Sequence, residues 1–271
     1  MPPGRVVHLS GRGQTFIREA KGPPGAPTVV LLHGLGATAD LNWFTAYGTL
    51  STRFNVVALD QRGHGRGIRP RTRFRLTDCA DDVAALVREL DTGPVVAVGY
   101  SMGGPVAQLL WHRHPEIVRG LVLAATSRNF RGAAMERLAF GGVGGAAIAA
   151  RIVPRRLVRR AAQRLIPVAD DDPFASWTAS QMRGHSPRGL LEAAAALGRF
   201  SSHRWIGDVD VPTAVIVTTY DQLVPPRRQY RLASSIDGAI VHEVAADHFA
   251  CTAAPRRFVP ALVAACEDVS R

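Results

Sequence analysis

Lysine is nearly absent from this sequence: Lys21 is the only one among its 33 basic residues. The formal net charge of +11 therefore comes almost entirely from arginine. A basic excess of this size is typical of proteins with anionic partners, but a coding bias of the source genome would produce the same arginine usage. The sequence has no interleaved aromatic and basic residues and no known nucleic-acid-binding module. We therefore expect no nucleic-acid partner.

Cysteine and long apolar runs are also scarce. Cys79, Cys251 and Cys266 are an odd, scattered set without a CxxC spacing, which argues against a disulfide framework. The N-terminal segment MPPGRVVHLSGRG lacks the apolar core of a signal peptide. No uninterrupted apolar run reaches the roughly 18 residues of a membrane-spanning helix. We expect a soluble, cytoplasmic protein, with export by an unrecognised route and the oligomeric state left open.

Apolar residues, by contrast, make up 46% of the 271 residues, enough for one α/β domain with an insertion. The segment 28–34 is apolar without alternation, as strands are when a parallel sheet is covered on both faces, and the strand before Ser101 is also continuously apolar. The predicted strands are 28–34, 55–60, 94–101, 118–126, 213–221 and 239–245. Two shorter segments, 5–10 and 14–20, predict a hairpin near the N-terminus.

Helical patterns separate these strands. Asp40 is predicted to cap a helix over 41–50, and Thr77 is predicted to cap a helix over 78–90. The other predicted helices cover 103–114, 227–236 and the segment from Pro255 onward. This alternation predicts an α/β fold with a mostly parallel central sheet and helices on both faces.

The alternation stops between residues 127 and 208. Helical patterns continue there without buried strands, and they cover 131–140, 153–166 and 187–200. We therefore predict a helical cap over 127–208, inserted into an α/β core that consists of 1–126 and 209–271.

The segment GYSMGG places Ser101 between an apolar strand and an amphipathic helix. A sharp strand-to-helix turn crowds its central residue, and Gly99 and Gly103 relieve that crowding. The turn exposes the hydroxyl at the carboxyl end of the sheet, in front of the positive end of the helix. Because this context is what a nucleophile elbow requires, we predict that Ser101 is a nucleophile.

A serine hydroxyl needs a base, and the base needs an orienting carboxylate. His248 follows the last predicted strand and should lie at the same sheet edge as Ser101. Asp221 ends the strand 213–221, and the loop after it would let the carboxylate reach His248. Asp247 is adjacent to His248 in sequence, but sequence neighbours seldom orient one another in this way. The predicted order of the triad is Ser101, Asp221 and His248.

The segment HGLG, residues 33–36, ends the first long buried strand. Its glycines allow the backbone to approach a ligand closely. The backbone N–H groups of Leu35 and Met102 are predicted to form an oxyanion hole. An ordinary glycine turn is the alternative interpretation of this segment.

With GYSMGG, HGLG and the order Ser, Asp, His in place, the chain resembles the α/β-hydrolase superfamily over essentially its whole length. The loop DQRGHG, residues 60–65, also resembles a loop of that family, and 127–208 takes the place of its cap. The resemblance implies the roles given above for Ser101, Asp221 and His248, and for the N–H groups of Leu35 and Met102. A serine at the elbow, where some relatives carry aspartate, implies acyl transfer.

The predicted cap carries an amphipathic helix at 151–166. Arginines occupy one of its faces: Arg155, Arg156, Arg159, Arg160 and Arg164. We interpret it as a lid helix with a solvated outer face. A weak contact with an anionic membrane surface, or with the phosphates of an acyl-CoA, is the alternative. Aromatic and methionine side chains predicted to line an apolar pocket are Trp43, Phe130, Phe140, Trp177, Met182 and Phe249.

Together these features predict a serine hydrolase without cofactor or metal that cleaves a carboxylic ester through an acyl-enzyme. An acyl-CoA thioesterase and a C–C bond hydrolase are alternatives with the same triad. A ligand-binding protein that kept the fold is the non-enzymatic alternative. The sequence leaves the physiological substrate and its chain length open.

Overall fold

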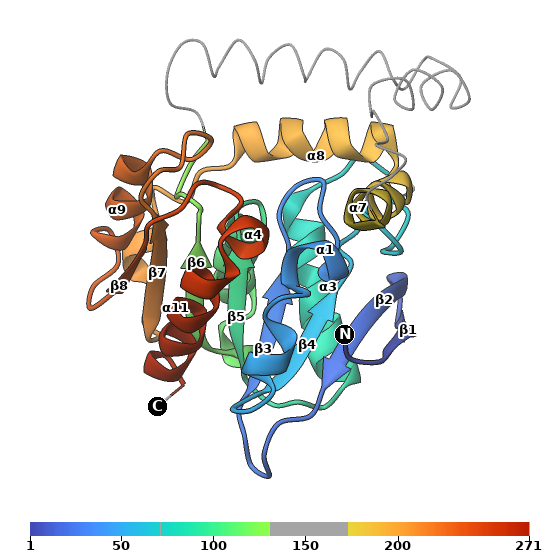
Figure 1. Ribbon diagram of the computed structural model, residues 1–271, viewed down its shortest axis with the longest axis horizontal. Coiled ribbons are helices and arrows are strands. Elements are labelled where there is room, and N and C mark those ends of the chain that lie inside the picture. Colours follow the sequence, from blue (N-terminus) through green and yellow to red (C-terminus); the bar gives the residue numbers. More distant parts are fainter. Residues whose placement is uncertain (71, 131–172, 271) are drawn as a thin grey trace.

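The computed structural model describes residues 1–70, 72–130 and 173–270 (Figure 1). An eight-stranded sheet has the order β1-β2-β4-β3-β5-β6-β7-β8. Its strands are β1 (Gly4–Leu9), β2 (Gly13–Ala20), β3 (Thr28–Leu32), β4 (Asn55–Leu59), β5 (Val95–Tyr100), β6 (Val118–Ala124), β7 (Thr213–Thr218) and β8 (Ile240–Val244). β2 pairs antiparallel with β1 and β4, and every other pair is parallel. The predicted α/β fold, strands and N-terminal hairpin are confirmed.

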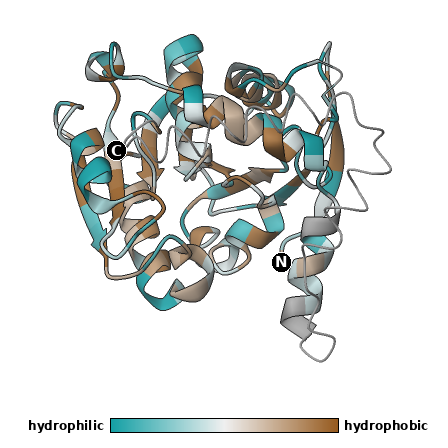
Figure 2. Cartoon of the chain, turned by 90° about the horizontal axis from the view of Figure 1, so that it is seen from above, coloured by the Kyte–Doolittle hydropathy of each residue, from teal (hydrophilic) through white to brown (hydrophobic). Residues whose placement is uncertain are grey.

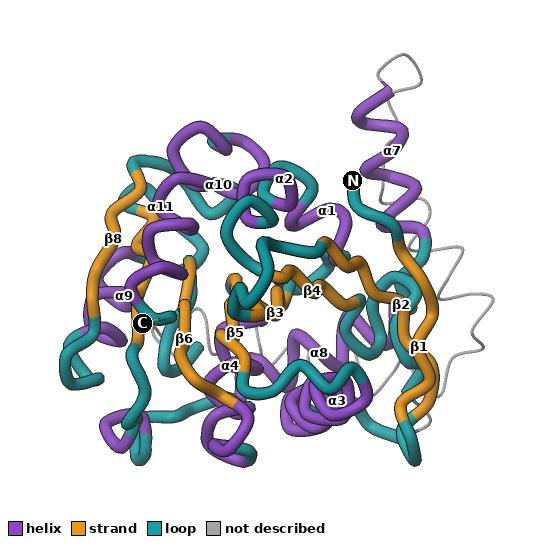
Figure 3. Tube along the Cα trace, turned by 90° about the horizontal axis from the view of Figure 1, so that it is seen from below, coloured by secondary structure: helices purple, strands orange, loops and turns teal. Residues whose placement is uncertain are grey.

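Helices cover both faces of this sheet, as the view along it shows (Figure 3). The α-helices are α1 (Ala39–Trp43), α2 (Tyr47–Leu50), α3 (Leu76–Glu89), α4 (Gly103–Arg113), α7 (Pro173–Arg183), α8 (Pro187–Arg199), α9 (Pro226–Ala233), α10 (Ala250–Ala253) and α11 (Pro255–Asp268). The short 3₁₀ helices are η1 (Pro115–Ile117) and η2 (Ile206–Asp208). One core cluster joins α3, α4 and α9 to the sheet, and the other joins α1, α2, α10 and α11.

The central strands are apolar throughout because both of their faces are covered. All residues of β3, β5 and β7 are buried. The outer helices alternate between hydrophobic and hydrophilic residues along their length (Figure 2). This alternation is expected of helices that pack one face on a sheet and expose the other.

Between β6 and β7 the described chain is helical, with α7, α8 and η2. In Figure 1, α8 crosses above the end of the sheet at which β5 leads into α4. The predicted helix at 187–200 is therefore confirmed by α8, whereas the predicted helices at 131–140 and 151–166, with their arginines, lie outside the described residues. The cap boundaries at 127 and 208 stay a prediction. No helix in the described ranges has both the length and the apolar content needed to cross a membrane.

Two predicted helix caps are wrong. The hydroxyl of Thr38, not Asp40, accepts the capping hydrogen bond of α1, from the N–H of Leu41. Thr77 lies inside α3, whose N-cap is Arg75 without a side-chain hydrogen bond. Thr38 comes two residues earlier than the predicted cap and has the same ability to accept from the first turn.

Asp40 instead belongs to a buried network of charges. Its carboxylate accepts two hydrogen bonds from Arg18, at 2.7 and 2.9 Å, and one from Arg66 at 2.9 Å. Arg66 also pairs with Asp60, which accepts from the backbone N–H of Ala39 at 2.8 Å. Burial alone would raise the pKa of Asp40, but the guanidinium hydrogen bonds and charges outweigh it and hold that pKa below its ordinary value. The network therefore ties β2 and the loop after β4 to the start of α1.

Replacing Asp40 by asparagine should lower the free energy of unfolding by about 2–3 kcal/mol at pH 7, because two guanidinium groups lose their buried carboxylate. The pKa of Asp40 is depressed in the folded state, so its contribution is present above the unfolded pKa and lost as the pH falls through the folded value. Urea denaturation of both proteins should show the difference at pH 7 and its progressive decrease as the pH falls below about 4. Asp237→Asn, at an exposed position, is the control. If both variants lost the same free energy of unfolding, the charge network around Asp40 would not be the source of the stabilisation.

Candidate active site

Ser101 occupies the turn between β5 and α4 and adopts a positive φ of 51°. This conformation costs a residue with a side chain roughly 1–2 kcal/mol and persists only where the surroundings impose it. The surroundings here are backbone atoms in close contact. A Cβ atom on Gly99 would lie 2.3 Å from the carbonyl oxygen of Gly103, and one on Gly103 would lie 2.1 Å from that of Leu32. Neither position accepts any other residue without a shift of the backbone.

The imidazole of His248 lies between the hydroxyl of Ser101 and the carboxylate of Asp221. The distance from Ser101 Oγ to His248 Nε2 is 2.9 Å, and that from His248 Nδ1 to Asp221 Oδ2 is 2.7 Å. The network fits one tautomer, in which the serine O–H donates to Nε2 and Nδ1–H donates to Asp221. Asp247 does not join this chain, because its carboxylate accepts from the N–H of Phe249 at 2.9 Å. The structure thus brings together the three residues predicted from the sequence.

Asp221 is buried, and several donors fix its carboxylate. Oδ1 accepts from the N–H groups of Leu223 and Val224, at 2.9 and 2.8 Å. Oδ2 accepts from the hydroxyl of Thr218 at 2.8 Å and from Nε2 of Gln229 at 3.2 Å. Sequence reasoning missed Thr218 and Gln229, because a threonine in a strand and a glutamine in a helix carry no signal of their own.

The base is anchored as well. The hydroxyl of Tyr100, the residue before the elbow serine, donates to the backbone carbonyl of His248 at 2.8 Å. The end of β5 therefore holds the loop that follows β8. Tyr100 was not predicted as a site residue, because an aromatic residue in an apolar strand suggests a position in the core.

The loop 33–36 runs directly beside the serine. A Cβ on Gly34 would lie 3.3 Å from the Cβ of Ser101, and the N–H of Gly34 donates to Oδ1 of Asn42 at 2.9 Å. Within the described parts of the chain, the backbone N–H groups of Leu35 and Met102 have no hydrogen-bond acceptor. Their assignment to an oxyanion hole stays a prediction.

A pocket of about 340 Å³ opens beside Ser101 and His248. Its wall is largely apolar and includes Leu35, Ala37, Leu41, Tyr100, Cys251 and Phe249. In the described residues, no arginine, lysine or carboxylate lines it. Of the predicted pocket residues, Phe249 lines this pocket.

The other predicted pocket residues lie elsewhere. Trp43 is fully buried and packs against the ring of Tyr100 at a centroid distance of 6.0 Å. Phe130 belongs to the core cluster on the other face of the sheet, and Trp177 packs against Phe44. For these three, the prediction that they line the pocket is wrong, because aromatic residues in a core and in a pocket wall look alike in a sequence. Met182 lies in α7, but its side chain, like the whole of Phe140, is outside the described residues.

Comparisons with known proteins identify the family to which this fold belongs. A family model described as alpha/beta hydrolase fold matches residues 27–143. A poly(3-hydroxyalkanoate) depolymerase of Ectopseudomonas oleovorans is 30% identical over 255 residues, which are 90% of this chain and 85% of that protein. The chain belongs to the alpha/beta hydrolase family.

Further relatives of this hydrolase carry different activities in their names. A pimeloyl-[acyl-carrier protein] methyl ester esterase of Neisseria meningitidis is 30% identical over 84% of this chain and 89% of its own length. A 2-(acetamidomethylene)succinate hydrolase of Mesorhizobium japonicum is 35% identical over 112 residues, but the match spans only 39% of that protein. The structure of a thermophilic esterase from Thermogutta terrifontis superimposes with a TM-score of 0.78 at 21% identity. The superposition covers 99% of this chain and 100% of that chain, so the two proteins share the fold.

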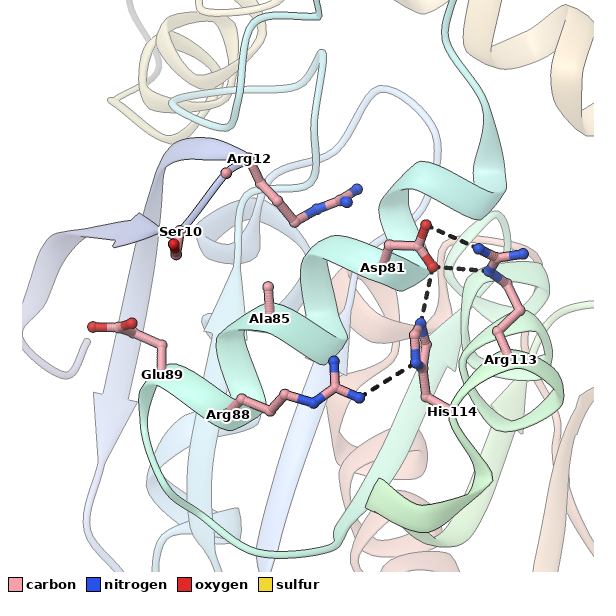
Figure 4. A pocket seen from close by; sticks show the side chains of 9 residues that line it. Ser10, Arg12, Asp81, Ala85, Arg88, Glu89, Arg113 and His114 are labelled. Atoms are coloured by element: carbon pink, nitrogen blue, oxygen red, sulfur yellow. Dashed lines mark hydrogen bonds and ion pairs between the residues drawn. The ribbon is translucent and has the colours of Figure 1, made fainter.

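The hydrolase has a second hollow, of about 610 Å³, along the outer side of α3 (Figure 4). All the basic side chains and Asp81 among its lining residues already have partners. Arg113 and His114 both bind the carboxylate of Asp81, and Arg88 binds Glu116. Because these ion pairs use the charges that would attract a ligand, we assign no chemistry to this hollow.

His33, the first residue of the loop 33–36, is one of three buried histidines whose rings lie close together. The ring of His64 lies 5.2 Å from that of His33 and 5.4 Å from that of His185. His33 Nε2 accepts from the N–H of Gln61 at 2.9 Å, so the ring is neutral and shapes the loop. Burial lowers the pKa of His33 to about 3, although the Gly34 carbonyl favours the charged form. The described residues include no His, Cys, Asp or Glu group suited to holding a metal ion.

The His33 ring is therefore expected to stay neutral down to about pH 4. Its pKa is depressed on folding, so the contribution of the neutral ring to stability is complete above about pH 6.5 and is lost as the pH falls toward 3. A pH titration of the histidine ring signals by NMR, assigned with His33→Asn, measures this directly. A midpoint for His33 above pH 5 would show that the ring is not held neutral by its surroundings.

Proposed function

We propose that this hydrolase cleaves carboxylic esters through Ser101, His248 and Asp221. The observation that carries the proposal is the continuous hydrogen-bond chain from the serine hydroxyl through the imidazole to the carboxylate. The apolar pocket beside Ser101 could bind an uncharged acyl or alcohol group of such an ester, which supports the proposal. The esterase activity named for one relative supports an ester over other acyl compounds.

In the first half of the reaction, Ser101 Oγ attacks the ester carbonyl while His248 Nε2 takes the hydroxyl proton. The negative charge that develops on the carbonyl oxygen is stabilised by the backbone N–H groups of Leu35 and Met102. His248 then gives its proton to the leaving alcohol, and the acyl group stays on Ser101. The positive end of α4, whose first residue is Gly103, favours the same developing charge.

In the second half, a water molecule loses a proton to His248 and attacks the acyl-enzyme. Proton return to Ser101 releases the acid and restores the starting state. Asp221 keeps Nδ1 protonated and stabilises the imidazolium in both halves, and the donors around its carboxylate keep it in this orientation. The sequence of steps requires no cofactor or metal.

Replacing Ser101 by alanine should lower turnover of 4-nitrophenyl butyrate by roughly 10⁶-fold without unfolding the protein, because the nucleophile is lost and the core is unchanged. A fluorophosphonate probe should label Ser101 in the parent protein, as read by peptide mapping. Ser234→Ala, at an exposed serine of α9's end, serves as the matched control. Near-parent turnover in the Ser101 variant would show that the nucleophile is another residue.

Asp221→Asn should reduce kcat by on the order of 10⁴-fold, because an amide presents a donor to His248 Nδ1 and favours the wrong tautomer. Asp247→Asn is the matched control and should have a far smaller effect, because Asp247 bonds only to the backbone of its own turn. Steady-state kinetics with the same ester rank the two variants. The reverse order would assign the role of the acid to Asp247.

A further inference from the structure

Two of the polar side chains that line the pocket beside Ser101 carry an unpaired buried atom. Asn42 and Thr178 both line it. Asn42 Nδ2 and Thr178 Oγ1 are buried, and neither has a hydrogen-bond partner among the described residues. Buried polar atoms are nearly always paired, so two unpaired ones in a single pocket call for a ligand or a water.

The orientation of the Asn42 amide is fixed by the backbone. Its Oδ1 accepts from the N–H of Gly34 at 2.9 Å. If the amide were flipped, its NH₂ group would face the N–H of Gly34, and two donors cannot form a hydrogen bond. The NH₂ group is therefore the part left without a partner, on a side chain that is 4% exposed. The unpaired group of Asn42 is therefore a hydrogen-bond donor.

Thr178 reaches the pocket from α7, across from α1. The hydroxyl of Thr38, the cap of α1, donates to Oε1 of Gln181 at 3.1 Å and holds α7 against α1. Thr178 lies three residues before Gln181 and so lies on the same face of the helix. Its hydroxyl can both donate and accept. The two unpaired atoms thus come from two different elements, Asn42 from α1 of the α/β core and Thr178 from α7 in the helical segment between β6 and β7.

We propose that the substrate of Ser101 carries a second, uncharged oxygen atom in its acyl chain, as a hydroxyl or an oxo group, that bonds to Asn42 Nδ2 and Thr178 Oγ1. A hydroxyl oxygen would accept from the amide and donate to the threonine, and an oxo oxygen would accept from both. A carboxylate does not fit, because no cationic side chain of the described residues lines this pocket. This inference rests on the proposed ester hydrolysis and narrows its substrate class to oxygenated acyl groups.

The test compares 4-nitrophenyl esters in matched pairs that differ by one oxygen. One pair is the 3-hydroxybutyrate and the 3-methylbutyrate, and similar pairs place a hydroxyl or oxo group one carbon nearer to or farther from the ester. For at least one pair, kcat/KM of the parent should favour the oxygenated ester by roughly tenfold or more, because the carbon analogue leaves both polar atoms unpaired. Thr178→Val and Asn42→Asp should each reduce that ratio several-fold. Asn42→Asp keeps the acceptor for Gly34 but replaces the NH₂ donor by a carboxylate oxygen. Because this also adds a charge beside Ser101, the readout is the ratio between the paired esters and not the absolute rate.

Two controls separate this effect from a general change of the pocket. Thr252→Val alters a threonine of the same pocket whose hydroxyl already donates to the carbonyl of Phe249, so the ratio should stay as in the parent whatever happens to the rate. Thr178→Ser restores a hydroxyl and should restore the ratio. Circular dichroism verifies the fold of each variant.

The outcomes distinguish the two proposals. If fluorophosphonate labels Ser101 but no oxygenated ester is preferred, or none is turned over, the substrate class is wrong and the unpaired atoms bind water. If the preference persists in both Thr178→Val and Asn42→Asp, the oxygen is recognised elsewhere and this inference is overturned. Failure to label Ser101 would instead contradict the proposed function itself.

Discussion

The close approach of three backbone segments at the elbow is the constraint on which the rest of the site depends. At Gly99 and Gly103 the carbonyl groups of Gly103 and Leu32 leave no room for a Cβ, and Ser101 between the two glycines has a positive φ. The contacts between β3, β5 and α4 fix where the hydroxyl lies before any ligand arrives. His248 and the loop 33–36 only need to be brought to that point. The free-energy cost of the strained residue is offset by the packing of a fully buried parallel sheet.

Around this rigid centre, two groups of described residues have different roles in the site. The sheet and its helices carry the reacting groups, and a network of charges and neutral histidines shapes the loop beside them. Asp60, which is fully buried, bonds to the first residue of α1, and His33 bonds to the backbone after β4. Helix α7 adds contacts to this loop region through Thr38 and Gln181. A change in the position of α7 would therefore reach the pocket wall without disturbing the triad.

The sequence was sufficient for features that depend on short-range patterns. Ser101, Asp221 and His248 each follow a predicted strand, and parallel strands place their carboxyl ends along one edge, so their meeting could be predicted. Thr218, Gln229 and Asn42 could not be found in this way, because their importance comes from partners that only the folded chain supplies. Asp40 was misread as a cap for the same reason, since its real partners are arginines on β2 and in the loop after β4. Trp43 shows how far a sequence predicts the position of an aromatic residue. The sequence suggests that such a residue is buried, but it does not show which residues surround it.

The hydrogen bond between Ser101 and His248 joins residues that are 147 positions apart in the chain. The nucleophile is delivered by a central strand, but its base follows β8, which is the edge strand and the last to be synthesised. A nascent or truncated chain that ends before this strand carries the serine elbow without any means of activating it. Catalytic competence therefore arises only when the final edge of the sheet has docked. Reversible opening of this edge, where pairing with neighbours is one-sided, would silence the enzyme while its core stays folded.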